Sequence, residues 1–222
     1  PNWATLVPAA RPLTSDNPFR KTMEARFIVG LSGNLGFTHD PDIVFEAARL
    51  LKDEPDIRFL LSGWGIGFER LKQLQNEANL PNVRFVARVQ DAELEAFLAA
   101  ADLWVIPYRK DVAGVSVPSR FYNLLAVGRP VVLVSEPEAE AALTVVENGL
   151  GWVVAPGHAD QLAEAIRAAS RSDIAAMAEH AVKVAARFDR NIALNAYAGL
   201  IDELLHGPDG TPDLNPDVAE QR

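Results

Sequence analysis

Short apolar runs alternate along the chain with longer segments in which apolar residues recur every three or four positions. The short runs predict buried strands, and the longer segments predict amphipathic helices that turn one face toward a core. Strand and helix follow one another in this way from about residue 25 onward. The predicted strands are 27–31, 57–61, 82–86, 103–107, 130–134 and 151–154, and the predicted helices between them are 40–51, 68–79, 91–100, 118–127 and 138–148.

Strict alternation with apolar strands predicts the fold class α/β: a Rossmann-like, doubly wound parallel sheet of about six strands, covered by helices on both faces. The segment 158–206 is expected to be helical, with breaks near Ser172–Asp173 and near Asp189. The predicted organisation is therefore a Rossmann-like domain over 25–185, followed by a C-terminal helix over 186–206.

The two ends of the chain differ from this pattern. Residues 1–24 are rich in proline and show no sustained period, which predicts an inter-domain linker in a fragment of a longer protein. Asn17 is a good N-cap and Pro18 suits the first helical position, so one short helix is expected there. Residues 207–222 are rich in Gly, Pro and Asp and are predicted to form a disordered tail.

Charge and composition narrow the classes of function. Acidic residues outnumber basic ones by 30 to 21 and give a net charge of −9, so no broad basic surface for nucleic acid is expected. The chain contains no cysteine, which excludes disulfides and thiolate metal ligands and fits a reducing compartment such as the cytoplasm. No apolar run reaches the length of a membrane span. An anionic ligand would have to be met by local features such as helix N-termini and single basic side chains.

Ligands of parallel α/β sheets bind beyond the carboxyl ends of the strands, so the loops at that edge carry the candidate site. The first of these loops contains Gly33, Asn34, Gly36 and His39 and leads into a helix. Glycines let the backbone approach a ligand closely, and the helix N-terminus attracts an anion. The alternative is a tight glycine-rich turn without a ligand.

Two further loops reach the same edge. Gly63 and Trp64 follow the second strand, and Arg88 and Val89 follow the third. Exposed backbone at these positions can hydrogen-bond the edge of a base. The alternatives are a turn with a packed Trp64 and a solvated Arg88.

The fourth loop has the highest density of candidate chemistry. It contains Lys110 and ends at Pro118, whose place at the first helical position leaves the next backbone amides free to point at an anion. Ser119 adds a hydroxyl group, and Arg120 adds a guanidinium whose geometry matches phosphate oxygens. The alternative is an ordinary helix start with solvated charges.

An ordered set of motifs resembles a known family: SGNLG followed by His39, then SGWG, NVRF, ADLWVIPY, GVSVPSRFYNLLAVGRPVV and NGLGWVV. Together they look like the C-terminal, donor-binding domain of a family 4 (group 1) retaining glycosyltransferase with the GT-B fold. The resemblance covers about residues 1–205. The opening PNWA is similar to the family's connector between two domains. The last helix, with Phe188, Tyr197 and Leu204, is similar to the one that crosses back toward the first domain.

The resemblance assigns roles by position. Asn34 and His39 occupy the places of a family Arg and Lys, and Ser119–Arg120 matches a branch of the family that has Ser-Lys there. Val115 and Asn123 occupy the places of two glutamates, separated by seven residues, that contact the donor sugar and the ribose. Asn123 can still hydrogen-bond ribose through its amide. The implied residues are Gly33, Asn34, Gly36, His39, Lys110, Ser119 and Arg120 for the donor diphosphate, Gly63, Arg88, Val89, Tyr122 and Asn123 for the nucleoside, and Gly114, Val115 and Ser116 for the donor sugar.

The implied reaction is a hexosyltransferase-type transfer, with retention, from a nucleotide-sugar donor to a glycan or glycolipid. Helix amides and Arg120 would stabilise the charge on the leaving diphosphate, so neither a cofactor nor a metal is expected. The family's acceptor site and a histidine near the donor sugar lie on an N-terminal domain. We therefore identify no catalytic residue and expect the isolated chain to have little or no transferase activity. Similar proteins assemble polysaccharides, which implies a cytoplasmic protein at the inner face of the membrane, associated through its other domain.

Three other functions account for less of the sequence. A nucleotide-sugar epimerase shares the architecture but needs acid and base residues that the motifs do not supply. A non-catalytic nucleotide-binding module is favoured by the departures at Val115 and Asn123. An oxidoreductase dinucleotide domain would need the G-x-G-x-x-G fingerprint, which the first loop lacks.

Overall fold

The structure, a computed structural model, describes residues 3–113 and 119–206. Each strand and helix predicted between residues 25 and 154 is present, with ends that differ from the prediction by no more than three residues. The strands are β1 (Phe27–Asn34), β2 (Ile57–Trp64), β3 (Val83–Phe85), β4 (Leu103–Pro107), β5 (Val131–Val134) and β6 (Gly151–Val154). The helices are α1 (Pro41–Leu50), α2 (Ile66–Ala78), α3 (Leu94–Leu98), α4 (Ser119–Ala126), α5 (Glu140–Glu147), α6 (Ala159–Arg171), α7 (Ile174–Ala185) and α8 (Arg190–His206), with 3-10 turns η1 (Asp91–Glu93) and η2 (Ala186–Phe188).

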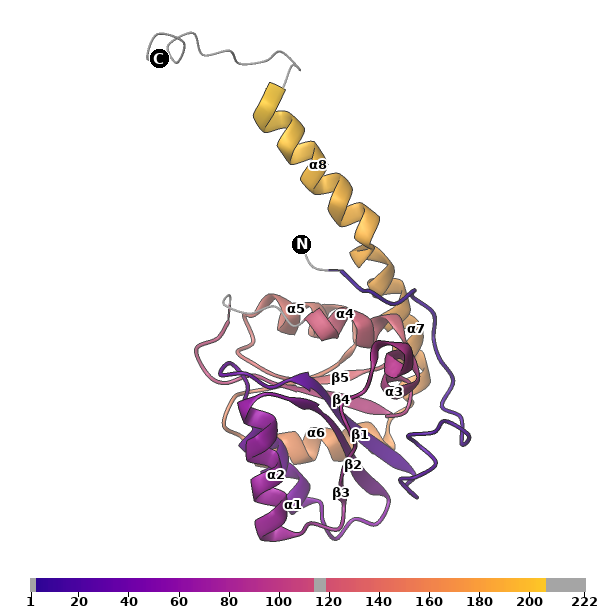
Figure 1. The fold of residues 1–222 in the computed structure, drawn as a ribbon, viewed down its shortest axis with the longest axis vertical. Coiled ribbons are helices and arrows are strands. Elements are labelled where there is room, and N and C mark those ends of the chain that lie inside the picture. Colours follow the sequence, from indigo (N-terminus) through magenta and orange to yellow (C-terminus); the bar gives the residue numbers. More distant parts are fainter. Residues whose placement is uncertain (1–2, 114–118, 207–222) are drawn as a thin grey trace.

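The named strands form one parallel sheet in the order β3-β2-β1-β4-β5-β6 (Figure 1). This order confirms the predicted doubly wound α/β fold. The chain moves outward from β1 through β2 to β3 and then returns to β4 on the other side of β1. At such a reversal of strand order, the loops that follow the two central strands lie on opposite faces of the sheet and leave a crevice at its carboxyl edge.

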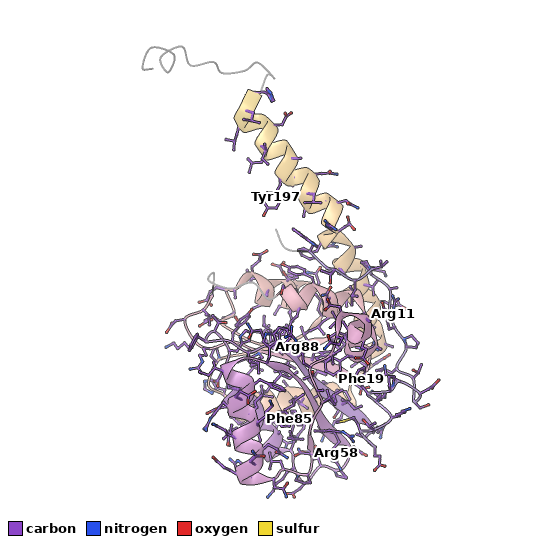
Figure 2. All side chains as sticks on the ribbon, in the orientation of Figure 1. Arg11, Phe19, Arg58, Phe85, Arg88 and Tyr197 are labelled. Atoms are coloured by element: carbon purple, nitrogen blue, oxygen red, sulfur yellow. The ribbon has the colours of Figure 1, made fainter. Side chains whose placement is uncertain are left out.

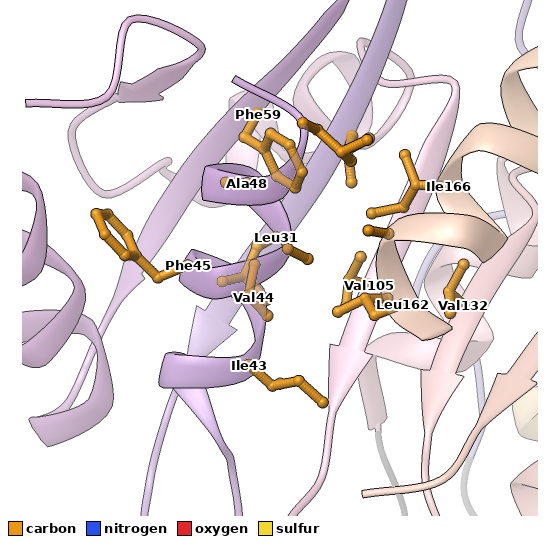
Figure 3. Packing of buried hydrophobic residues seen from close by; sticks show 14 of the residues in the cluster. Leu31, Ile43, Val44, Phe45, Ala48, Phe59, Val105, Val132, Leu162 and Ile166 are labelled. Carbon is orange, nitrogen blue, oxygen red and sulfur yellow. The ribbon is translucent and has the colours of Figure 1, made fainter. Parts of the chain in front are cut away.

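Successive residues of β1 contribute to two separate cores, because neighbouring side chains of a strand point to opposite faces of the sheet. Val29 and Leu31 pack with α1, α2 and α6, as Figure 3 shows for part of this core. Ile28 packs on the other face with α3, α4, α5 and α7. Burying one such side chain stabilises the fold by about 1.5–3 kcal/mol. A shift of register by one residue would exchange the two faces, so this burial fixes where the loops of the carboxyl edge lie.

The predicted short helix at Asn17 is wrong. The Asn17 carboxamide oxygen accepts hydrogen bonds from the backbone N–H groups of Phe19 (3.0 Å) and Arg20 (3.2 Å), as an N-cap does. The residues that follow form a turn over 18–23 and not a helix. One turn is too short to nucleate a helix, and Glu24 adopts a positive φ of 49°, which ends the turn before β1.

The helical segment after β6 is divided where the sequence predicts, near Ser172–Asp173 and near Asp189. Its last part, α8, projects away from the sheet, and Tyr197 lies near the middle of this helix (Figures 1 and 2). Ala193 is its buried residue. The predicted tail 207–222 lies outside the described residues. Large apolar side chains of α8 are exposed: Ile192, Leu194, Tyr197, Leu200, Ile201, Leu204 and Leu205.

Candidate functional site

A pocket of about 310 Å³ opens at the carboxyl edge of the sheet, where the loops after β1, β2 and β3 meet the start of α4. It therefore lies where the strand order predicts a ligand site. Most of the positions that sequence reasoning singled out around these loops contribute to it. Its lining consists of Trp3, Thr5, Ser32, Gly33, Asn34, Ser62, Gly63, Trp64, Arg88, Val89, Asp91, Leu94, Leu98, Ser119, Arg120 and Asn123.

The floor of the pocket is backbone that only glycine permits. β1 and β2 extend to Asn34 and Trp64, so Gly33 pairs with Gly63 one position before the end of the ladder. A Cβ on Gly63 would overlap the carbonyl oxygen of Gly33, and a Cβ on Gly33 would overlap the guanidinium of Arg120. Gly33 also has a φ of +95°, which other residues rarely adopt. The glycines thus allow Arg120 to lie directly against the end of β1.

Arg120 supplies the positive charge of the pocket. One of its terminal nitrogens donates a hydrogen bond to the carbonyl oxygen of Asn34 at 3.0 Å. Burial lowers the pKa of its guanidinium to about 10, and the group remains protonated near neutral pH. Within residues 3–113 and 119–206 it forms no ion pair with a carboxylate.

The first turn of α4 strengthens this positive potential. It begins at Ser119, whose exposed side chain lines the pocket beside Arg120, and it contains no acidic residue. The first backbone N–H groups of a helix have no partner within the helix and carry a partial positive charge. Ser119 and Arg120 therefore lie together at a helix start, where the first amides suit an anion, and the predicted binding of a diphosphate stays a prediction.

Trp64, Arg88 and Val89, which follow β2 and β3, form another part of the pocket lining. The guanidinium carbon of Arg88 lies 4.1 Å from the centroid of the Trp64 ring, a cation–π contact. Trp64 is 42% exposed, so the pair presents a flat, open surface at the pocket (Figure 2 labels Arg88). Planar groups of this kind can stack on a heterocyclic base.

Asn123 lies at the pocket but its amide is engaged. Its carboxamide oxygen accepts hydrogen bonds from the backbone N–H groups of Thr5 (2.7 Å) and Leu6 (3.2 Å). Its amide nitrogen lies 2.9 Å from the Thr5 hydroxyl oxygen and donates to it. Tyr122 does not line the pocket, because its ring is buried with a centroid 4.7 Å from that of Phe188.

Three predicted diphosphate residues, Gly36, His39 and Lys110, do not line this pocket. The His39 ring packs against Tyr108, with centroids 5.1 Å apart. Burial, followed by the nearby charge of Arg120, lowers the pKa of His39 to about 4. The imidazole is then neutral near pH 7, so it can offer a hydrogen bond but no full positive charge to a phosphate. Lys110 is exposed in the turn after β4.

The predicted sugar-binding residues Gly114, Val115 and Ser116 lie outside the described residues, so their role stays a prediction. Trp3, Thr5, Asp91 and Leu94 line the pocket although sequence reasoning did not name them. Trp3 and Thr5 belong to the segment predicted as a linker. No local pattern marks them as pocket residues, because they reach the pocket only through the path of the folded chain.

Within residues 3–113 and 119–206, no group of three or more His, Asp or Glu residues could hold a metal ion. The expectation of a reaction without a metal stays a prediction. In the same part of the chain, no helix is long and apolar enough to cross a bilayer.

A second pocket, of about 390 Å³, lies at the opposite, amino edge of the sheet. Arg129 and Asp102 line it just before β5 and β4, together with the start of α7. Asp102 is paired with Arg20 at 2.7 Å, and Arg129 donates to the carbonyl oxygen of Ala99 at 2.8 Å. None of the candidate residues from the sequence lies there, and its charged groups serve the fold.

Comparison with known proteins agrees with this geometry. The family model described as "Glycosyl transferases group 1" matches residues 15–189. The chain is 26% identical over 210 residues to the "Probable glycosyltransferase WbjE" of Pseudomonas aeruginosa, covering 92% of this chain and 52% of that protein. It is 29% identical over 174 residues to the "Putative colanic acid biosynthesis glycosyl transferase WcaI" of Escherichia coli K12, covering 76% of this chain and 42% of that protein. The chain thus spans about half the length of these curated relatives.

Among solved structures, the chain resembles Anabaena Alr3699/HepE in complex with UDP and glucose. The TM-score is 0.65 at 23% sequence identity, and the match covers 84% of this chain and 53% of that one. At this level of identity the likeness establishes the fold, which agrees with the GT-B half expected from the sequence motifs.

Proposed function

This chain belongs to the group 1 glycosyltransferases, and on that premise we propose that the pocket at the carboxyl edge binds the nucleoside diphosphate of a nucleotide-sugar donor. The observation that carries the proposal is Arg120. It is a protonated guanidinium without a carboxylate partner in the described structure, held at a helix start above glycine backbone. In a chain with a net charge of −9, such a group is best accounted for by an anionic ligand.

The two sides of the pocket suit the two parts of this ligand. Ser119, Arg120 and the amides of the first turn of α4 face the diphosphate. Trp64, Arg88 and the backbone around Val89 face the nucleoside, which stacks on the flat surface of the Trp64–Arg88 pair. The name of the HepE structure, which contains UDP and glucose, supports a uridine nucleotide as the first ligand to test.

The chemical contribution of this half is stabilisation of the leaving group. When the bond between the anomeric carbon and the diphosphate oxygen breaks, negative charge grows on the diphosphate. Arg120 and the helix amides are oriented toward that charge before the reaction begins, which lowers the barrier. This role needs no metal. We further propose that the configuration at the anomeric carbon is retained and that residues 114–116 contact the donor sugar.

The acceptor and the complete reaction extend beyond this chain. We propose that the acceptor is a glycan or glycolipid and that a second domain binds it, as in a complete GT-B enzyme. The name of WcaI, which refers to colanic acid biosynthesis, supports a polysaccharide pathway for the whole protein. The 222-residue chain is then expected to bind the donor without transferring its sugar.

The test is a calorimetric and thermal-shift panel of UDP, GDP, ADP and dTDP and their sugar conjugates. A ligand that binds the folded state raises the melting temperature, and a concentration of 100 times Kd adds about 2.7 kcal/mol of stability. Arg120→Ala is expected to weaken the affinity for a nucleoside diphosphate by about ten- to a hundredfold, because it removes charge-assisted hydrogen bonds worth about 1.5–3 kcal/mol. The bare nucleoside should bind as before.

Arg171→Ala is the matched control, because it removes one exposed positive charge from the end of α6, away from the pocket. It is expected to leave nucleotide affinity unchanged. If no nucleoside diphosphate binds the wild-type chain at millimolar concentration, or if Arg120→Ala binds it as well as wild type, the proposed function is wrong.

A further inference from the structure

The N-terminal segment Trp3–Arg11, here called the strap, lies along α4. The backbone N–H of Ala9 donates to the carbonyl oxygen of Ala126 at 2.8 Å, and that of Arg11 donates to the carbonyl oxygen of Val127 at 3.1 Å. These bonds satisfy carbonyl groups at the C-terminal end of the helix, which otherwise lack partners. The strap is thus docked on the fold and does not behave as a free linker.

The other end of the strap reaches the nucleotide pocket. Trp3 and Thr5 both line it, and Asn123 holds this end in place. The Asn123 oxygen accepts two backbone N–H groups of the strap, from Thr5 and Leu6, which occupies both of its lone pairs. Its amide nitrogen donates to the Thr5 hydroxyl. In this arrangement the Asn123 oxygen is committed to the strap, and one N–H of its amide remains for a ribose.

The chemistry of the strap suits a place beside an anion. From Trp3 to Ala10 it carries no charged side chain, although the chain as a whole is acidic. The Trp3 indole is half-buried and offers an apolar wall. The charged residue of the strap, Arg11, lies at its far end and is paired with Glu95 at 2.5 Å. Glu95 therefore neutralises this charge away from the pocket.

We propose that the strap is a wall of the nucleotide pocket and that Asn123 is a positioning residue that fastens it. The inference rests on the proposed function, since it names further contacts of the same site. Nucleotide binding and strap docking then stabilise each other, because a ligand that touches Trp3 and Thr5 binds only the docked strap. Coupling of this kind is reciprocal by thermodynamic necessity.

The test measures UDP and GDP affinity for wild type, Asn123→Ala, Trp3→Ala and the double variant. Each single variant is expected to bind about tenfold more weakly. The double variant is expected to bind no more weakly than Asn123→Ala alone, because a released strap no longer places Trp3 at the ligand. Val7→Ala, at a strap residue that is 75% exposed, is the matched control and should bind as wild type does.

Hydrogen exchange of the Thr5 and Leu6 amides gives a second readout. In wild type, UDP or GDP should slow exchange at both amides, and in Asn123→Ala both should exchange rapidly. Additive losses in the double variant would mean that Asn123 contacts the ligand itself. Exchange rates of the two amides that do not change with nucleotide would mean that the ligand does not bind against the strap. Either result would overturn the strap proposal alone. Failure of wild type to bind any nucleotide would overturn the proposed function and the strap proposal together. Trp3→Ala changes a half-buried side chain that belongs to neither hydrophobic core, so the test does not depend on the folding of Asn123→Ala.

Discussion

Gly33→Ala perturbs the pocket at its most constrained point. Gly33 has a φ of +95°, and an added Cβ would overlap the guanidinium of Arg120. Backbone strain at this φ costs about 1–2 kcal/mol. Arg120 must also move and lose its hydrogen bond to the Asn34 carbonyl, which is worth about 1 kcal/mol. The expected loss in the free energy of unfolding is therefore about 2–3 kcal/mol.

The assay has two parts. The stability of Gly33→Ala is measured by urea unfolding. Its affinity for UDP and GDP is measured by calorimetric titration in buffer without urea, at a temperature where the variant is folded. The displaced guanidinium no longer faces the diphosphate, so the affinity is expected to fall by about tenfold or more. Gly149→Ala is the matched control. Gly149 also has a positive φ, of +60°, but nothing lies within 4 Å of an added Cβ. It should show the backbone strain without the loss of affinity.

The difference between the two variants isolates the contact with Arg120. If Gly33→Ala and Gly149→Ala lose the same stability, and Gly33→Ala binds nucleotide as wild type does, then Arg120 does not need to lie against the end of β1. The account of the pocket floor would be refuted.

Two further predictions concern titration and a buried ion pair. The pKa of His39 is about 4 in the fold against an ordinary 6.5, so the unfolded chain binds the proton more readily, and the free energy of unfolding should fall as the pH drops from 6.5 toward 4. His39→Gln should remove that part of the pH dependence of urea midpoints, and equal slopes in both proteins would contradict it. Asp102→Ala should cost about 3 kcal/mol in urea unfolding, because it removes a buried carboxylate and leaves the partly buried Arg20 guanidinium without its partner at 2.7 Å. Glu69→Ala breaks an exposed pair with Lys72 and should cost at most about 1 kcal/mol, so similar losses would refute the role of burial.

Periodicity along the chain predicted most of the fold because the signal is local. Alternating apolar runs and amphipathic segments located every strand of the sheet. The predictions of β1 and β2 were too short because Ser32-Gly33-Asn34 and Ser62-Gly63 are polar or small and carry no strand pattern. They continue the ladder because each pairs with the other.

The site was predictable to the extent that it depends on strand ends. Gly33, Gly63, Ser119 and Arg120 meet in one pocket because carboxyl ends of parallel strands share an edge. Tyr122 was predicted at the nucleoside and instead packs on Phe188 in the core, because a helix turns adjacent residues to different sides.

The sequence by itself determined the α/β alternation, the parallel sheet and the edge at which the candidate pocket opens, since each follows from residues close together in the chain. Only the tertiary structure decided that His39 loses its charge, that Asn123 holds the strap, and that Trp3 and Thr5 reach the pocket. The physical reason is that burial and hydrogen-bond partners depend on segments far apart in sequence. Thr5 and Asn123 are 118 residues apart, and no local pattern records that they meet.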